Sequence, residues 1–123
     1  MDADEIAQRL FAAIEAGDIS AVAALYAPDI VVWLNTLGEA RSRDENLATL
    51  TWVTHNLSEF RYTDIRRTVT PVGFVQQHVV QAINRAGECV SVAACIVATI
   101  SDGLITRIDE YLDSAHAATL LAK

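Results

Sequence analysis

The chain is poor in basic charge. Nine Lys and Arg residues stand against 16 Asp and Glu among 123 residues, a formal net charge of -7 at pH 7. Such a surface repels phosphate groups, so we expect neither nucleic acid nor an anionic membrane as a partner. The sequence also lacks the run of ~20 apolar residues that spans a bilayer. Its acidic start, MDADEIAQRL, differs from a secretory signal, which begins with positive charge.

Cysteine is scarce too, with only Cys89 and Cys95 present. On one strand these two residues would lie about 20 Å apart at ~3.3 Å per residue. A disulfide needs Cα atoms within about 7 Å, so we expect two free thiols. Free thiols favour a reducing compartment, and we expect a cytoplasmic location. No cysteine or histidine spacing indicates a metal site, and we expect no metal and no cofactor.

Hydrophobic residues make up 52% of the chain, with five glycines and two prolines. This composition and length exclude disorder and predict a single domain over residues 1–123. Apolar residues recur at helical intervals in three segments of the first half, two of which begin with capping-box spacing. The residues expected to begin or end these helices are Asp2, Gly17, Asp18, Pro28, and Ser42 followed by Glu45.

Strands dominate the rest of the chain. Ile30–Asn35 is β-branched and aromatic and predicts a first strand. After residue 59, four longer strands are expected over residues 60–70, 74–84, 88–100 and 104–112, followed by a short C-terminal helix from Ser114. Helices followed by a long antiparallel meander predict an α+β fold.

The expected hairpin turns bring candidate functional residues together. If residues 86–87 and 102–103 are both two-residue turns, His78, Cys95 and Glu110 lie in one row on one face of the sheet. Largely apolar residues share that face, which is typical of a small-molecule pocket. The expected lining includes Cys95, Val97, Ile108 and Leu112.

Structural interpretations of the same residues remain open. Glu110 could be a buried acid paired with an arginine such as Arg66 or Arg67, and His78 could be a core histidine. A three-residue loop at 86–87 would turn His78 to the other face. Cys95 could simply be a small core residue. The other two histidines, His55 and His116, are expected on helix surfaces.

Two segments carry a family resemblance: AAIEAGDISAVAALYAPDIVV near the start and SDGLITRIDEYLD near the end. Their order and spacing resemble the SnoaL-like branch of the nuclear transport factor 2-like superfamily. The resemblance implies a cone-shaped, curved antiparallel sheet wrapped by N-terminal helices, a cystatin-like α+β barrel with an apolar cavity. It also implies a homodimer formed through the sheet.

Within that superfamily, Trp33-x-Asn35 and Glu110 resemble the water-binding set of limonene epoxide hydrolases, with Trp33 in place of a tyrosine. His78 stands near the arginine of those enzymes, and their epoxide-protonating aspartate is absent. The ketosteroid isomerase base would fall near Leu34, which accepts no proton. SnoaL-like polyketide cyclases use a pocket acid, often near a histidine, which Glu110 and His78 resemble.

Two functional hypotheses follow. In the first, the protein is a cofactor-independent hydrolase, isomerase or cyclase acting on a small hydrophobic molecule. Glu110 would be the general base, Asn35 would orient water or a carbonyl group, and His78 would donate a proton or hydrogen bond. Trp33 would form a pocket wall, with Tyr26 and Tyr62 as further donors. In the second, the same fold is a non-catalytic binding or dimeric scaffold module.

Overall fold

The computed structural model describes residues 1–123, and its first half is mainly helical. The helices are α1 (Ala3–Ala16), α2 (Ile19–Leu25) and α3 (Arg43–Asn56). Asp2, Asp18 and Ser42 cap their N-termini as expected, and Ser42 and Glu45 form a capping box. Gly17 ends α1 in the left-handed conformation, at φ 69°. These local signals were all confirmed.

The sheet has six strands in the order β2-β1-β6-β5-β4-β3. Its strands are β1 (Tyr26–Leu34), β2 (Glu39–Arg41), β3 (Ser58–Thr70), β4 (Gly73–Ile83), β5 (Cys89–Ser101) and β6 (Leu104–Leu112). The expected α+β fold is confirmed. The sheet is mixed, because β1 pairs with β6 in parallel. A short helix α4 (Ser114–Ala118) and a 3₁₀ turn (Thr119–Leu121) end the chain.

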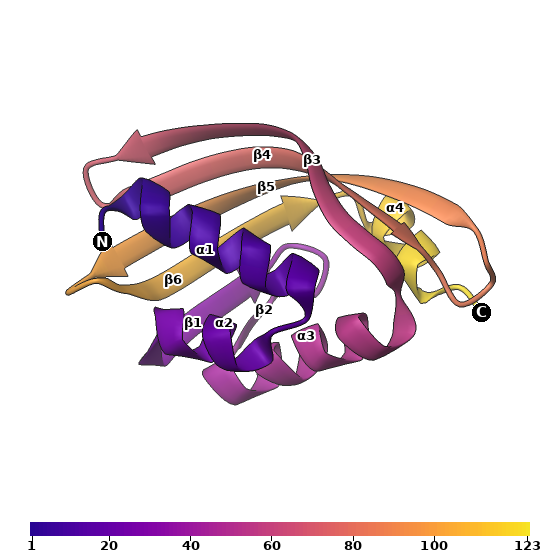
Figure 1. Ribbon diagram of the computed structural model, residues 1–123, viewed down its shortest axis with the longest axis horizontal. Helices are drawn as coiled ribbons and strands as arrows, with labels where there is room; N and C mark the ends of the chain where they lie inside the picture. Colours follow the sequence, from indigo (N-terminus) through magenta and orange to yellow (C-terminus); the bar gives the residue numbers. More distant parts are fainter.

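The helices and the curved sheet enclose one hydrophobic core. Figure 1 shows α1, α2 and α3 on the same side of the sheet, with α1 lying across the strands. The core contains Ile6, Leu10, Val22, Phe74 and Ile105, each no more than 1% exposed. We call the face of the sheet toward these helices the inner face and the opposite one the outer face. No helix is long and apolar enough to cross a membrane.

The first strand begins earlier than expected. The sequence predicted that Pro28 ends the second helix and that the strand starts at Ile30. Instead α2 ends at Leu25, and β1 already begins at Tyr26. A register irregularity between Tyr26 and Val31 accommodates Pro28, which has no backbone N–H to donate.

The β5–β6 hairpin has the predicted turn and then changes register. Ser101 pairs with Leu104, and Asp102 and Gly103 both have positive φ, at 53° and 77°. Beyond Ile100 the register shifts by one residue. Ile96, rather than Cys95, therefore lies opposite Glu110.

The β4–β5 connection differs from the predicted two-residue turn. Asn84 and Glu88 flank a loop of three residues, and Gly87 in it has φ 81°. The buried Asn84 side-chain oxygen accepts hydrogen bonds from the backbone N–H groups of Ala86 and Glu88, both at 3.0 Å. This Asx-type turn stabilises the longer loop. Within the sheet, His78 consequently pairs with Ala94.

The two register changes together leave His78 and Glu110 facing the same side of the sheet, although not level with each other. The predicted row of His78, Cys95 and Glu110 is wrong, because each hairpin is displaced by one residue. His78 and Glu110 still share the inner face, but Glu110 is level with Gln76, two positions along the strand from His78. Cys95 lies between the buried Ala94 and Ile96 and therefore points to the outer face.

Candidate functional site

A small cavity lies between the helices and the inner face of the sheet. Its volume is about 60 Å³. Most of its lining is apolar. The residues with polar groups are Asn46 of α3, Tyr26 of β1, Tyr62 of β3 and Glu110 of β6. The lining residues are Leu10, Phe11, Ile14, Tyr26, Val32, Asn46, Leu50, Tyr62, Ile96, Ile108 and Glu110.

Glu110 is the acid of this cavity. It lies on β6, and its neighbours on the same face are Ile108 on its own strand and Ile96 across the β5 pair. Its carboxylate accepts no hydrogen bond and joins none of the four salt bridges of the protein. Desolvation by burial raises the pKa of Glu110 from 4.5 to about 7. The acid is therefore close to half-ionised at neutral pH.

The alternative in which an arginine pairs with Glu110 is wrong in this structure. Arg67 instead forms an ion pair with Asp4, at 2.8 Å between Nε and Oδ1. Arg66 is exposed and makes no salt bridge. Glu110 thus lacks the partner that would hold its pKa low.

Hydrogen-bonding groups surround the acid. The Tyr26 hydroxyl donates to Asn46 Oδ1 at 2.8 Å, and both side chains are buried. Burial, followed by the charge of Glu110, raises the pKa values of Tyr26 and Tyr62. Both hydroxyls therefore stay protonated at neutral pH. Tyr62 lies over Phe11, with ring centroids 4.9 Å apart.

His78 lies on the inner face but not in the lining of the cavity. Its ring packs behind Tyr62 and Phe11, with centroid separations of 4.7 and 5.5 Å. The side chain is 2% exposed, and desolvation lowers its pKa from 6.5 to about 4. The ring is accordingly neutral at pH 7. Its Nδ1 atom meets Gln76 Nε2 at 2.9 Å, whereas its buried Nε2 atom has no partner.

Asn35 lies outside the cavity. It was expected to hold a water or a carbonyl group beside Glu110, but both ends of its amide bind the Leu112 backbone. Its Nδ2 atom donates to the Leu112 carbonyl at 3.1 Å, and its Oδ1 atom accepts from the Leu112 N–H at 2.9 Å. These bonds tie the end of β1 to β6 and engage both ends of the amide of the exposed Asn35.

Three expected lining residues lie on the outer face. Trp33 contacts Tyr111 there, with ring centroids 5.4 Å apart, and forms no wall of the cavity. Cys95 and Val97 alternate with the buried Ala94, Ile96 and Ala98 and point outward because of the register shifts. Leu112 shares the face of Glu110 but does not line the cavity, whereas Ile108, Tyr26 and Tyr62 do.

Four residues near the site were not among the predicted site residues. Asn46 is the only buried residue of α3, in a segment where the expected buried face was apolar. Gln76 is completely buried beside His78, and Arg67 and Asp4 lie behind it. A polar residue on an otherwise apolar stripe, such as Asn46 four residues before Leu50, is the signal that could have revealed the first.

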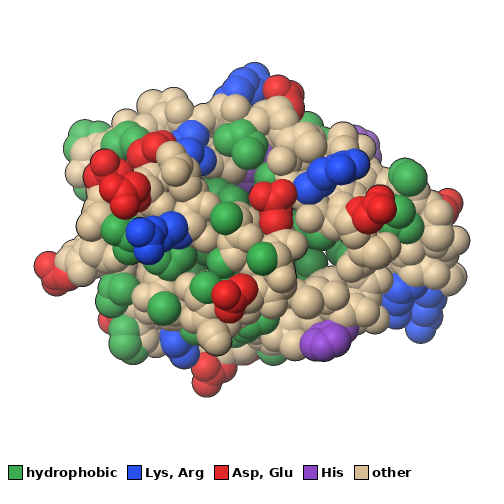
Figure 2. Space-filling model, in the orientation of Figure 1, with side chains coloured by type: hydrophobic (Ala, Val, Ile, Leu, Met, Phe, Trp, Pro, Cys, Tyr) green, Lys and Arg blue, Asp and Glu red, His purple; other side chains and the backbone are tan.

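The remaining chemistry of the chain is simple. No group of three or more His, Cys, Asp or Glu side chains is arranged to hold a metal ion. Both cysteines are free thiols, and His55 and His116 are exposed as expected. In Figure 2 acidic and basic side chains alternate over the helical side, with no continuous basic patch. The cytoplasmic location stays a prediction.

The family model of the SnoaL-like domain matches residues 7–108. The chain belongs to the SnoaL-like domain family. A search of curated proteins gave no match.

Solved structures show the same nuclear transport factor 2-like fold. A proposed polyketide cyclase from Pseudomonas putida KT2440 has 22% identity and a TM-score of 0.85, over 99% of both chains. A nuclear transport factor 2-like protein of unknown function from Burkholderia pseudomallei K96243 has 18% identity and a TM-score of 0.85, over 100% of both. A hypothetical protein with a ketosteroid isomerase-like fold from Catenulispora acidiphila, in complex with trimethylamine, has 14% identity and a TM-score of 0.78, over 89% of this chain and 86% of its own.

Proposed function

We propose that this SnoaL-like protein is a cofactor-independent enzyme in which Glu110 removes a proton from a small, largely apolar substrate. The observation that carries the proposal is the unpaired Glu110 carboxylate in an apolar cavity, with its pKa raised to about 7. A general base works best when its pKa is near the working pH. An acid placed only for stability would form an ion pair or accept hydrogen bonds, and the Glu110 carboxylate does neither.

Two donors of the cavity are free to orient the substrate. Asn46 and Tyr62 line the cavity, and neither Asn46 Nδ2 nor the Tyr62 hydroxyl makes a hydrogen bond within the protein. Opposite a base, such donors stabilise the negative charge that develops on a carbonyl oxygen when an adjacent C–H loses its proton. This arrangement favours cyclase or isomerase chemistry on a carbonyl compound. Relatives with the same fold include a proposed polyketide cyclase.

The size of the cavity limits the substrate. About 60 Å³ accommodates a few water-sized groups. Pockets for drug-sized ligands measure roughly 300–1,000 Å³. We therefore propose that the substrate is small or enters as α3 moves outward. Leu50 and Asn46 form the α3 side of the cavity, and Asn46 is the only buried residue of that helix.

The small cavity also favours a second candidate, a non-catalytic binding module. A relative was crystallised with trimethylamine, a molecule without an acidic C–H beside a carbonyl group. In such a module Glu110 would bind a ligand and transfer no proton.

We also propose that two copies associate through the outer face. Val97 and Tyr111 are 37% and 47% exposed there, and Trp33 lies against Tyr111. An exposed apolar patch of this kind is typical of an interface.

Proton abstraction can be tested without knowledge of the natural substrate. Cyclopentanone in D₂O exchanges its α-protons when a base removes one and a solvent deuteron replaces it, and ¹H NMR measures the rate. We expect the wild-type protein to accelerate exchange above the buffer rate, with a half-maximal rate near pH 7. Glu110→Gln should abolish the acceleration. Glu59→Gln, which changes an exposed acid, is the matched control.

The outcomes separate the candidates. Exchange that is equal in the wild-type protein and Glu110→Gln contradicts the role of Glu110 as the base. Backbone NMR shifts at the cavity residues on addition of cyclopentanone, without any exchange, support the binding module instead.

A further inference from the structure

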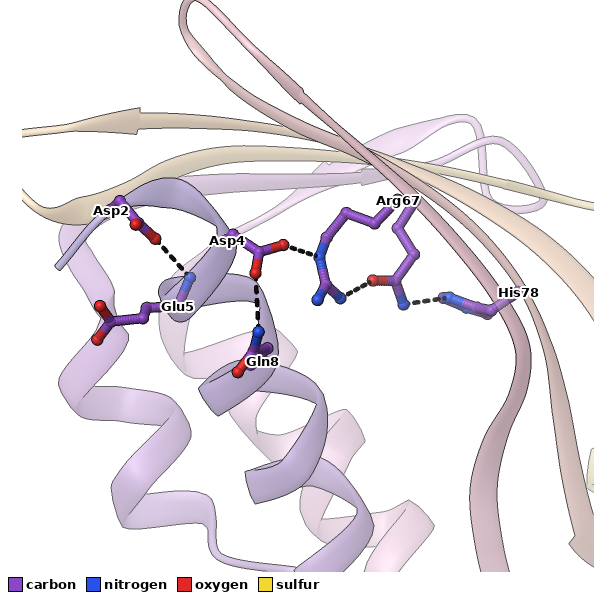
Figure 3. A network of polar contacts seen from close by, with 7 residues as sticks. Asp2, Asp4, Glu5, Gln8, Arg67 and His78 are labelled. Carbon is purple, nitrogen blue, oxygen red and sulfur yellow. Dashed lines mark hydrogen bonds and ion pairs between the residues drawn. The ribbon is translucent and has the colours of Figure 1, made fainter.

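A chain of polar contacts runs from the first turn of α1 to His78 (Figure 3). Arg67 Nε donates to Asp4 Oδ1 at 2.8 Å, and Arg67 Nη1 donates to Gln76 Oε1 at 2.7 Å. Gln76 Nε2 then meets His78 Nδ1 at 2.9 Å. Gln76 is completely buried and His78 is 2% exposed, so water does not compete for these groups.

The chemistry of each member fixes the direction of the next bond. A guanidinium group only donates hydrogen bonds, so the Gln76 carbonyl oxygen must face Arg67. The Gln76 NH₂ group consequently faces His78 and donates to Nδ1. In a neutral imidazole one nitrogen accepts and the other carries the proton. The proton of His78 is therefore on Nε2.

The protonated nitrogen is the one without a partner. His78 Nε2 is buried and bonds to no protein atom. The ring makes edge contacts with Tyr62 and Phe11, which line the cavity of Glu110, and does not itself line it. An unsatisfied buried donor costs roughly 1–3 kcal/mol, and native proteins keep few of them. A ligand oxygen that reaches past Tyr62 would satisfy it.

We propose that Asp4, Arg67 and Gln76 are positioning residues that hold His78 as its Nε2–H tautomer, and that the site thereby takes a substrate with a carbonyl-type oxygen as hydrogen-bond acceptor. The second half rests on the proposed function, whereas the tautomer does not depend on any reaction. The acceptor would bind to His78, while Glu110 acts elsewhere on the same molecule.

The tautomer can be read directly by NMR. In a ¹⁵N-labelled sample near pH 7.5, long-range ¹H–¹⁵N correlations distinguish a protonated ring nitrogen from an accepting one. We expect His78 to have a protonated Nε2 and an accepting Nδ1. His55 is an internal reference of the opposite kind, because its Nδ1 meets the Thr51 carbonyl oxygen at 2.9 Å and must donate to it. A protonated Nδ1 at His78 overturns the proposal.

Substitutions test the positioning role. Arg67→Met frees the Gln76 amide to rotate, so a population with protonated Nδ1 should appear at His78. Arg67→Lys keeps a donor toward Gln76 and should restore the wild-type spectrum. Arg66→Met is the matched control, because Arg66 is the exposed neighbour of Arg67 and takes no part in the chain of polar contacts. Identical His78 spectra in the Arg66→Met and Arg67→Met proteins would show that Arg67 has no positioning role.

A further variant covers the case in which Arg67→Met does not fold. Gln76→Glu keeps the shape and the bond to Arg67 but replaces the NH₂ donor with an acceptor. We expect His78 Nδ1 to become protonated in this variant. An unchanged Nε2–H tautomer overturns the argument from Gln76.

The acceptor class is tested with two probes of one shape. Cyclopentanone should shift the His78 Nε2 resonance, whereas methylenecyclopentane, which lacks the oxygen, should not. Equal shifts, or no shift with either probe, overturn the assignment of a carbonyl-type ligand. A shift with cyclopentanone without Glu110-dependent exchange supports the donor and rejects the base, so the two proposals fail separately.

Discussion

The pH dependence of stability gives the sharpest test of Glu110. In the folded protein its pKa is about 7, against an ordinary value of 4.5. Between these two pH values the folded state keeps a proton that the unfolded state has lost. Stability therefore falls as the pH rises through this window, and the loss is complete above the folded pKa. At about 1.4 kcal/mol per pKa unit, the full cost is about 3 kcal/mol.

Glu110→Gln removes this titration, because the amide is neutral at every pH. At pH 5.5 about 1.4 kcal/mol of this cost is present, and at pH 8.5 nearly the full cost is present. The free energy of unfolding of the variant, minus that of the wild type, should therefore rise by about 2 kcal/mol between these pH values. Urea unfolding followed by Trp fluorescence measures it, above the isoelectric point near 4.7.

The comparison isolates one residue. His78, with its pKa lowered to about 4, has the opposite effect and loses stability as the pH falls below 6.5. Its contribution is the same in both proteins and cancels in the difference. Glu59→Gln, which changes an exposed acid outside the cavity, is the control variant. A flat difference for Glu110→Gln, or a variant that is less stable at high pH, would refute the desolvated, unpaired acid.

Three further predictions concern neighbouring parts of the structure. Tyr26→Phe removes the buried hydroxyl that donates to Asn46 and should lower the free energy of urea unfolding by about 1 kcal/mol; wild-type stability would contradict this. Gly73→Ala would place a Cβ in a steric clash with the Ala98 backbone carbonyl oxygen and should lower the melting temperature, whereas an unchanged temperature would show that β4 can shift. Val97→Asp should convert a wild-type dimer to monomer in analytical ultracentrifugation; a monomeric wild type rejects the outer-face dimer.

Local signals in the sequence predicted the elements well. Helix caps and tight turns depend on residues a few positions apart, so Ser42 with Glu45 and the turn at 102–103 are visible in the sequence itself. The start of β1 was less predictable. Pro28 favours the end of a helix, but tertiary pairing with β6 extends the strand back to Tyr26.

The orientation of side chains depended on register, which single residues control. Asn84 enlarges one loop through its own side chain, and the irregularity after Ile100 displaces the next strand pair. Neither has a pattern that distinguishes it from an ordinary turn or strand. Each change reverses the faces of a strand, so Cys95 moved outward while Glu110 and His78 stayed together.

The chain from Asp4 to His78 had no local signature. Asp4 and Arg67 are 63 positions apart and meet only because α1 lies across the strands. The sequence suggests an exposed acid in a first helical turn and one arginine of a pair. Only the packed structure shows that these groups determine how a buried histidine is protonated.

The unpaired groups on the inner face argue for a reaction rather than a purely structural role. Tyr26, Arg67 and Asn84 all have hydrogen-bond partners. The Glu110 carboxylate has none, and neither do the donors His78 Nε2, Asn46 Nδ2 and the Tyr62 hydroxyl. An unpaired polar group lowers stability, so a substitution that removes it would be favoured unless a function requires the group. The unpaired groups are of two kinds, since Glu110 accepts a proton and the others donate hydrogen bonds. A substrate that loses a proton at one atom while negative charge develops on an oxygen needs both.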